Sequence, residues 1–266
     1  MRRAVPVRSF PFAALAMVLC LCSTVHAAHP LITDDTGVQG AGKVQIEVNG
    51  EYGKDQRSAA GITEKATISQ AAISLTYGAT DSLDLALTLP YIQTRITQDG
   101  ATVSDASGMS DLTFEAKWKF FEKDGLSFAL KPGITASTGD EQQGLGTGRT
   151  TCSLFFISTK EIEPWAVHAN LGYIRNQNDP VWVNEEKNLW HASIAAEFAL
   201  SKKLRIVGNL GVEKNPEKGA TDNPAFAILG VIYNITDDFE IDGGVKRGIT
   251  DPEMDTTALA GLTVRF

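Results

Sequence analysis

The fold is decided by the last stretch of the chain, TTALAGLTVRF (Thr256–Phe266). In an extended strand, one face of this stretch is apolar and carries Ala258, Ala260, Leu262, Val264 and Phe266. The other face carries Thr257, Gly261, Thr263 and Arg265, with Leu259 as the one apolar exception. An alternation with a period of two is typical of a strand that separates an apolar phase from a wetter one.

The same stretch ends on an aromatic residue, with apolar residues two and four positions before it. This ending resembles the closing strand that outer-membrane β-barrels present to their assembly machinery. That machinery is therefore an expected partner, and the expected assembly signal is Leu262, Val264 and Phe266. The alternative is an edge strand of a soluble β-sandwich. An open edge invites aggregation, whereas a barrel pairs its last strand with its first, so the barrel is favoured.

The N-terminus has the pattern of a secretory signal peptide. Arg2, Arg3 and Arg8 precede an apolar run at 10–22, and a small-residue cleavage site follows Ala27. The run is too short to cross a bilayer as a helix. We therefore expect residues 1–27 to be removed after export and the mature chain to begin at Ala28.

Charge and cysteine content narrow the classes of protein further. Removing residues 1–27 leaves 21 basic against 32 acidic residues, a net charge of −11, which argues against a nucleic-acid partner. Cys20 and Cys22 leave with the signal peptide, so Cys152 has no internal disulfide partner. After Cys22 no apolar run is long enough for a membrane helix. Membrane strands stay possible, because their signal per segment is much weaker.

Twelve segments are predicted as strands. They are 43–52, 66–77, 83–91, 111–121, 126–137, 151–159, 165–174, 189–200, 204–213, 225–233, 239–246 and 256–266. The segment 83–91 alternates most clearly, with Leu83, Leu85, Leu87, Leu89 and Tyr91 on one face. The segments 151–159 and 225–233 are apolar on both faces, and their faces are left unassigned.

Connection lengths and aromatic positions favour a membrane barrel. The connections after even-numbered segments are short, whereas most of those after odd-numbered segments are long, polar and glycine-rich, as at 93–110, 138–149 and 175–187. Outer-membrane barrels show this alternation of periplasmic turns and outer loops. Aromatic residues cluster near both ends of the segments and match two bilayer interfaces: Tyr77, Trp165, Tyr233, Phe239 and Phe266 at one end, Tyr52, Tyr91, Tyr173 and Trp190 at the other. The predicted fold is all-β, a twelve-stranded antiparallel transmembrane β-barrel of outer-membrane type spanning residues 43–266.

The segment 28–42 precedes the first strand and lacks alternation. We expect it either to lie in the periplasm or to fold into the barrel as a plug. Asp34 and Asp35 are a candidate cation-binding pair, but such a pair more often serves only to solvate a polar leader. No metal site and no cofactor are expected.

Polar residues on the strand faces opposite the apolar ones are the lumen-lining candidates. They are Glu47, Asp84, Glu115, Lys117, Lys119, Lys131, His168, His191, Glu197, Arg205, Glu213, Glu240, Asp242 and Lys246. They form either the wall of a wet channel or a salt-bridged polar filling. Twelve strands lie between the roughly 8 that side chains fill and the 16 to 18 that leave an open pore. A narrow or partly occluded lumen is therefore expected.

An enzyme is the less favoured class. A lipid hydrolase would need a nucleophile with a base in hydrogen-bond reach. His168 and His191 are the only histidines on predicted strands, and Ser193 lies two residues from His191, a spacing that is common by chance. Gly144, Gly146 and Gly148 lie in a loop without a following helix, so a phosphate-binding loop is not indicated.

Short motifs along the mature chain carry a family resemblance. They are PLITDD (30–35) leading to QIE (45–47), Gly108 with DL (111–112) and Lys117, GIT (133–135) with TG (138–139), NLGY (170–173), and Gly230 with Tyr233. With them the chain resembles the outer-membrane transporters associated with the meta-pathway of phenol degradation. One departure is Ser137, where family members often have proline.

The resemblance implies passage of small molecules, aromatic or hydrophobic compounds among them, across the outer membrane of a Gram-negative cell. No energy-coupling domain is visible in the sequence, so the flux is expected to follow the gradient. The expected partners are outer-membrane lipid and a small-molecule solute, and the resemblance supplies no catalytic residues. The alternative function is a non-conducting barrel with a structural or interaction role. Oligomeric state is left open.

Overall fold

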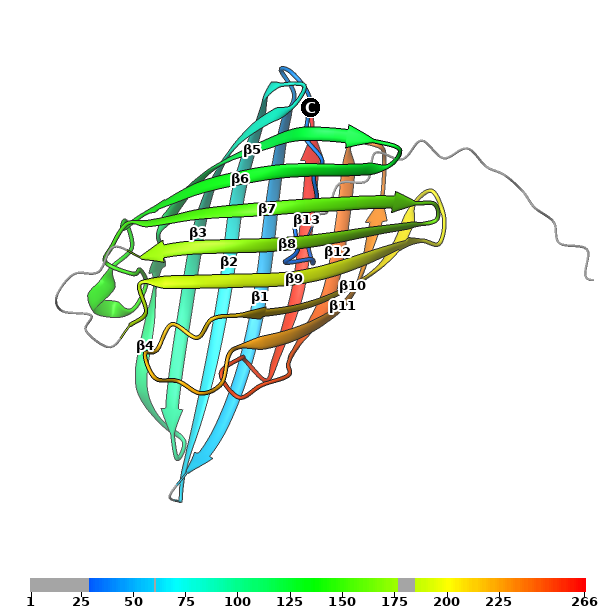
Figure 1. Cartoon of the computed structure of the whole chain (residues 1–266). Coiled ribbons are helices and arrows are strands. Elements are labelled where there is room, and N and C mark those ends of the chain that lie inside the picture. The colour runs from blue at the N-terminus through cyan, green and yellow to red at the C-terminus, as the bar shows by residue number, and fades with distance from the viewer. Residues whose placement is uncertain (1–28, 60, 177–184) are drawn as a thin grey trace, which may run out of the picture.

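Figure 1 shows the computed structural model, which describes residues 29–59, 61–176 and 185–266. The signal peptide expected at residues 1–27 lies outside these ranges. The described part contains one short 3₁₀ helix (η1, Glu141–Gln143), and none of its helices is long and apolar enough to cross a membrane. Its strands are β1 (Val44–Ala59), β2 (Ile62–Thr80), β3 (Leu83–Gln98), β4 (Ala101–Met109), β5 (Leu112–Lys123), β6 (Leu126–Ala136), β7 (Thr151–Ile162), β8 (Trp165–Asn176), β9 (Asn188–Ala199), β10 (Leu204–Glu213), β11 (Ala225–Asn234), β12 (Phe239–Gly248) and β13 (Thr256–Arg265).

The strands form one antiparallel sheet that closes on itself. β1 pairs with both β2 and β13, and β2 also pairs with β3. β4 and β5 share one edge of β3, because β4 pairs with its residues 91–98 and β5 with its residues 83–88. The thirteen strands thus occupy twelve positions around the wall. This confirms the twelve-stranded antiparallel barrel.

The last strand makes the seam of the barrel. Residues 45–54 of β1 pair with residues 256–265 of β13, and the backbone N–H of Phe266 donates to the carbonyl of Val44 at 2.9 Å. Closure leaves no unpaired edge in the wall, which is the condition for strands in a solvent that offers no hydrogen bonds. The end of the barrel with the connections 81–82, 124–125, 163–164, 200–203 and 235–238 is called here the short-turn end, and the opposite end the long-loop end.

Alternation along each strand places apolar side chains outside. In β3, Leu87 and Leu89 are 41% and 40% exposed on the outer face, whereas Asp84 is 2% exposed on the inner face. The aromatic residues near both ends follow the outer face, as Trp165 (49%) and Tyr173 (46%) do in β8. A band of exposed apolar side chains between aromatic belts is the surface that a bilayer covers.

The two segments that are apolar on both faces resolve into an outer and an inner face. In β11, Leu229 is 68% exposed outside, whereas Ile228 and Ile232 are 5% and 0% exposed. Leu259, the apolar exception in β13, packs inside with Phe226 and Ile228 of β11. Part of the inner wall is therefore apolar, which removes the polar contrast on which face assignment from sequence depends. In β7 the outer residues are Cys152, Leu154 and Phe156, and the inner ones include Ile157 and Thr159.

The predicted loop at 93–110 is wrong. β3 continues to Gln98, turns, and returns as β4, while β1 and β2 extend to the hairpin at 59–62. Figure 1 shows these strands reaching well beyond the others at the long-loop end. The extension carries charged and polar residues on both faces, as in the exposed ion pair between Arg95 and Asp105 (2.6 Å). A strand that faces water on both sides shows no alternation of apolar and polar residues, so the sequence pattern did not reveal β4.

Candidate functional site

The leader, defined here as residues 29–42, lies inside the barrel in the half of the lumen near the short-turn end. Pro30, Thr33 and Asp35 of the leader are almost completely buried. Its hydrogen bonds and ion pairs reach β1, β3, β5, β6, β7, β9, β10 and β12, so it contacts the wall nearly all the way round. A chain segment that lies inside a barrel needs hydrogen-bond partners on the wall, because its backbone N–H and C=O groups lose their hydrogen bonds to water.

The first residues of the leader fit against β11 and β12. Pro30 lies over Gly230 and Gly244, where a Cβ on Gly230 would come within 2.6 Å of the proline Cγ. His29 Nδ1 pairs with Asp242 Oδ1 at 2.6 Å. The two glycines therefore provide the space that the proline occupies, and the carboxylate holds the imidazole beside it.

The next residues bind the middle of β9 and β10. The backbone N–H groups of Ile32 and Thr33 both donate to Asn209 Oδ1, at 2.8 and 3.0 Å. Asn209 Nδ2 donates in return to Thr33 Oγ1 at 2.6 Å, and Thr33 Oγ1 donates to Ser193 Oγ at 2.7 Å. One amide side chain thus replaces water for two backbone groups of the leader.

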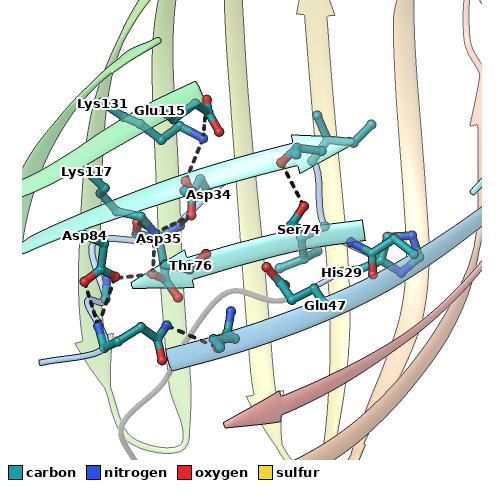
Figure 2. Close-up of a pocket in the computed structure, with 18 of the residues that line it drawn as sticks. His29, Asp34, Asp35, Glu47, Ser74, Thr76, Asp84, Glu115, Lys117 and Lys131 are labelled. Atoms are coloured by element: carbon teal, nitrogen blue, oxygen red, sulfur yellow. Dashed lines mark hydrogen bonds and ion pairs between the residues drawn. The ribbon is translucent and has the colours of Figure 1, made fainter. Parts of the chain in front are cut away.

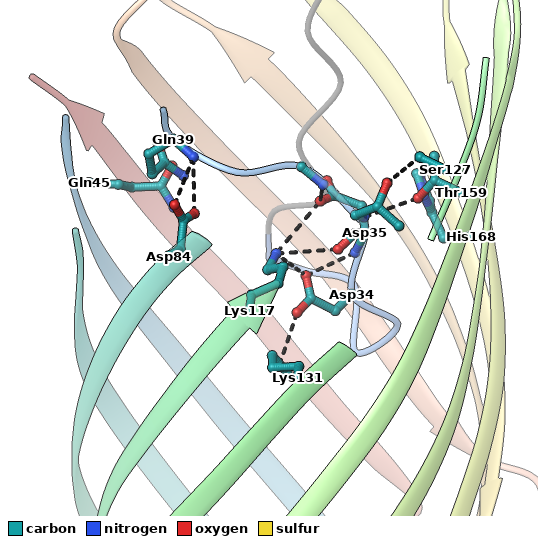
Figure 3. Close-up of polar contacts among 12 residues, drawn as sticks. Asp34, Asp35, Gln39, Gln45, Asp84, Lys117, Ser127, Lys131, Thr159 and His168 are labelled. Atoms are coloured by element: carbon teal, nitrogen blue, oxygen red, sulfur yellow. Dashed lines mark hydrogen bonds and ion pairs between the residues drawn. The ribbon is translucent and has the colours of Figure 1, made fainter. Parts of the chain in front are cut away.

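Asp34 is the centre of a charge cluster between the leader and the wall. Its carboxylate oxygens lie 2.9 Å from Lys117 Nζ and 2.9 Å from Lys131 Nζ, as Figure 3 shows. Lys131 also lies 3.2 Å from Glu115, and Lys117 lies 3.7 Å from Asp35. Two lysines of the wall are therefore held by two carboxylates of the leader, in a place where an unpaired charge would be costly.

The last residues of the leader bind β7, β6 and β3. The N–H of Thr36 donates to Thr159 Oγ1 at 3.1 Å, and its hydroxyl lies 2.5 Å from Ser127 Oγ. The N–H of Gln39 donates to both oxygens of Asp84, at 3.1 and 3.0 Å. Asp84, predicted as a wall residue, thus serves here as an acceptor for leader backbone.

A second charge cluster lies on the other side of the lumen, between β8 and β12. Arg205 bridges Glu197 at 2.9 Å and Glu240 at 2.6 Å. His168 Nε2 lies 3.5 Å from Glu197 Oε1. All four side chains were among the lumen-lining candidates, and the barrel brings them together from β8, β9, β10 and β12.

The remaining candidates are spread along the lumen. Lys119 pairs with Glu122 near the exposed short-turn rim, and Lys246 pairs with Glu253 near the long-loop end. Glu47 lies on β1 beside the leader, and among the described residues no ion pair reaches it. The candidates therefore divide into two clusters and several separate pairs, with no single polar filling.

His191 and Ser193 do form a hydrogen bond, at 2.9 Å, and Glu213 lies 3.5 Å from the other ring nitrogen of His191. Ser193 is only 9% exposed, and it accepts the hydroxyl of Thr33 of the leader. A nucleophile needs room for its substrate. Here the leader occupies that room, so the pair acts as a support for the leader.

The leader leaves part of the lumen unfilled. A cavity of about 240 Å³ lies between the leader and the wall formed by β1, β2, β3, β5 and β6 (Figure 2). Its lining is mostly polar and includes Glu47, Asn49, Ser74, Thr76, Asp84, Thr88, Glu115, Lys117 and Lys131, together with leader residues from His29 to Gln39. This cavity is the part of the lumen beside the leader that side chains do not fill.

Several residues of the site were not among the candidates. Ser127, Thr159 and Asn209 hold leader backbone or hydroxyl groups, and Gly230 and Gly244 provide the proline slot. Uncharged hydroxyls, an amide and glycines occur on the inner faces of many strands. Their alternation with outward apolar residues showed that they face inward, but nothing in the sequence showed what they touch.

The two leader carboxylates titrate in opposite directions. Burial raises the pKa of Asp35 to about 6, although Lys117 opposes the shift. Burial acts on Asp34 too, but the ammonium groups of Lys117 and Lys131 outweigh it and hold the pKa of Asp34 well below its usual range. Asp34 is therefore the permanent charge of the leader, and Asp35 is the group that changes charge near neutral pH.

Lowering the pH from 7 to 5 is expected to strengthen the docking of the leader by about 1.4 kcal/mol through Asp35. A carboxyl with a folded pKa above its unfolded value holds more protons in the folded state, so stability rises as pH falls through 6 and the gain ends near 3.8. The groups that face Asp35 are Lys117, Asp34, His168 and Glu197. The measurement is the rate of proteolysis of the leader at both pH values.

Asp35→Asn is the matched control for this pH effect. It removes the titrating carboxyl and leaves His168 in place, so the difference between the two proteins isolates Asp35. Equal pH dependence in wild type and variant would contradict the assignment.

The closed wall, the exposed apolar band and the leader inside the lumen define an outer-membrane-type β-barrel. The chain belongs to the family described as "Putative MetA-pathway of phenol degradation", whose sequence model matches residues 29–266. The match confirms the resemblance carried by the short motifs.

Solved structures of outer-membrane barrels share the fold. An outer membrane channel from Pseudomonas putida F1 is 17% identical, with a TM-score of 0.70 over 87% of this chain and 98% of the other. The translocator domain of the autotransporter NalP from Neisseria meningitidis is 14% identical (TM-score 0.57; 87% and 91% covered), and the KdgM porin is 9% identical (0.54; 84% and 99%). No curated protein sequence matches the chain.

Proposed function

We propose that the protein is an outer-membrane channel through which small molecules diffuse down their gradient. In this proposal residues 1–27 direct export and are cleaved after Ala27, the leader acts as a partial plug, and residues 43–266 form the membrane-spanning wall. In this proposal flux follows the concentration difference.

The cavity beside the leader is the observation that supports this function. The leader binds β9 and β10 closely through Thr33 and Asn209, yet about 240 Å³ stays free on the side of β1, β2, β3, β5 and β6. A twelve-stranded barrel that the leader partly fills has a narrow path, which limits passage to small solutes. The channel from Pseudomonas putida F1 has the same fold and adds support.

The family description favours aromatic or hydrophobic compounds as solutes. The mostly polar cavity favours solutes with at least one polar group, and a phenol satisfies both conditions. Liposomes that contain the protein are therefore expected to take up phenol-sized aromatic alcohols faster than protein-free liposomes do. Equal uptake by the two kinds of liposome would show that the protein does not conduct this class of solute.

The alternative is a non-conducting barrel whose loops and β1–β4 extension serve an interaction role. One observation favours it: the leader contacts the wall nearly all the way round. Conductance of the refolded full chain in planar bilayers separates the two functions. Steady unitary steps support the channel, whereas silence from protein with intact barrel circular dichroism supports the alternative.

We also propose that Leu262, Val264 and Phe266 form the assembly signal read by the barrel-assembly machinery. The Phe266 side chain is 70% exposed at the seam. Phe266→Ala is expected to lower the amount of folded protein in the outer membrane severalfold, as measured by heat-modifiable mobility in gels. Phe266→Tyr, which keeps the ring, should assemble normally, and both variants should refold in detergent, where no machinery acts. Normal assembly of Phe266→Ala in cells would contradict the signal.

A further inference from the structure

We infer that the cavity beside the leader binds small cations in preference to anions and that Glu47 sets this preference. The inference rests on the proposed channel function and adds which sign of ion the same cavity prefers. It is argued from the lining charges, from their partners and from buried oxygen atoms that lack donors.

Carboxylates outnumber ammonium groups around the cavity. The described lining residues that carry charge are Asp34, Asp35, Glu47, Asp84 and Glu115 against Lys117 and Lys131. Both lysines are already held, Lys117 by the two leader aspartates and Lys131 by Asp34 and Glu115. The charge that a passing solute meets is therefore negative.

Glu47 is the lining carboxylate whose partner is neutral, since the side chain of Gln45 hydrogen-bonds to it. Asp84 accepts two hydrogen bonds from leader backbone, and Glu115 pairs with Lys131, whereas no ion pair within the described part of the chain includes Glu47. Glu47 lies opposite Ser74 of β2, whose hydroxyl is 2.8 Å from that of Thr88. A carboxylate with hydroxyls beside it is an oxygen-rich surface of the kind that cation channels use.

Two other lining residues present oxygen atoms without donors. Asp35 Oδ2 and Asn49 Oδ1 are buried, and neither accepts a hydrogen bond from the described residues. The side chain of Asp35 is only 2% exposed. A buried acceptor without a donor is unfavourable, and both oxygens add to the negative potential that a ligand in the cavity meets.

The site does not have the form of a metal centre. Among the described residues, no group of three or more His, Cys, Asp or Glu side chains could hold a metal ion. A site without a closed ligand shell binds weakly and releases readily, as conduction requires. The ligand class is therefore monovalent cations, alkali ions and small organic ammonium ions alike.

The test is the reversal potential of the refolded full chain in a planar bilayer under a potassium chloride gradient. Wild type is expected to prefer potassium over chloride. Glu47→Gln is expected to lower the permeability ratio about fivefold to tenfold, the effect of one elementary charge a few ångströms from the path in a partly solvated lumen. Glu47→Asp keeps the charge and should keep the preference. Glu163→Gln, at an exposed short turn outside the lumen, is the control for surface charge and should leave the ratio unchanged.

Each outcome is decisive. Conductance without a preference for cations in wild type would overturn this inference and leave the channel intact. A preference that Glu47→Gln does not change would overturn the role of Glu47. Silence in the bilayer, from protein whose barrel is folded by circular dichroism, would overturn the proposed channel itself. Replacing potassium by methylammonium in the same gradient measures whether organic cations pass as well.

Discussion

Replacing Leu87 with arginine is expected to lower the free energy of unfolding by about 2 to 4 kcal/mol. Leu87 lies near the middle of the membrane-spanning part of β3, and its side chain is 41% exposed on the outer face. A guanidinium at this depth must displace lipid or draw water into the hydrocarbon. The measurement is a denaturant titration of the protein refolded in lipid vesicles.

Two control variants show whether the loss of stability in Leu87→Arg comes from the depth of residue 87 in the membrane and from its place on the outer face. Ile62→Arg places the same charge at the tip of the β1–β2 hairpin, where Ile62 is 49% exposed beyond the closed wall, and should have almost no effect. Asp84→Asn, on the inner face of β3, should cost far less than Leu87→Arg, because an amide oxygen still accepts the N–H of Gln39. A larger loss for Asp84→Asn than for Leu87→Arg would mean that the two faces are inverted.

Replacing Asp34 with alanine is expected to weaken leader docking by about 3 to 5 kcal/mol, the usual cost of removing one partner from a buried charge group. Lys117 and Lys131 would keep only Asp35 and Glu115 as described carboxylate partners. The wall strands bind one another directly, so the barrel should stay folded. Released leader should be cut faster by added protease, and conductance should rise.

Asp81→Ala is the matched control for this variant. Asp81 lies at the exposed turn after β2 and accepts one hydrogen bond, from the N–H of Ala41 at 3.1 Å. Its loss should leave both proteolysis and conductance nearly unchanged. If Asp34→Ala keeps its leader as well protected as wild type does, the charge cluster is not what holds the leader.

Strand positions and faces were predictable where one face met lipid and the other a polar lumen. In β3 the leucines and Asp84 gave that contrast, and both lie where the alternation placed them. β4 was not predictable, since both its faces are wet, and neither were the faces of β11, since its inner residues Ile228 and Ile232 are apolar. Periodicity reports a difference between two environments, and in these strands the two faces are alike.

The site was predictable only in part, because its contacts join residues far apart in the sequence. The inward charges followed from alternation, but the pairing of Asp34 with Lys117 and Lys131 depends on where the leader enters the closed barrel. Asn209 and Gly230 gave no hint of binding the leader, since a lone amide or glycine on an inner face fits many roles.

The course of the leader has a mechanical consequence. Its first described residue, His29, lies beside Asp242. Near its other end, Gly40 and Gly42 lie beside Gly78, and their φ angles are +88° and +80°. Both places are in the same half of the lumen, so the described leader begins and ends at one end of the barrel. The far half of the lumen is therefore left to the wall strands, and the left-handed glycines Gly40 and Gly42 form the turn by which the leader joins β1.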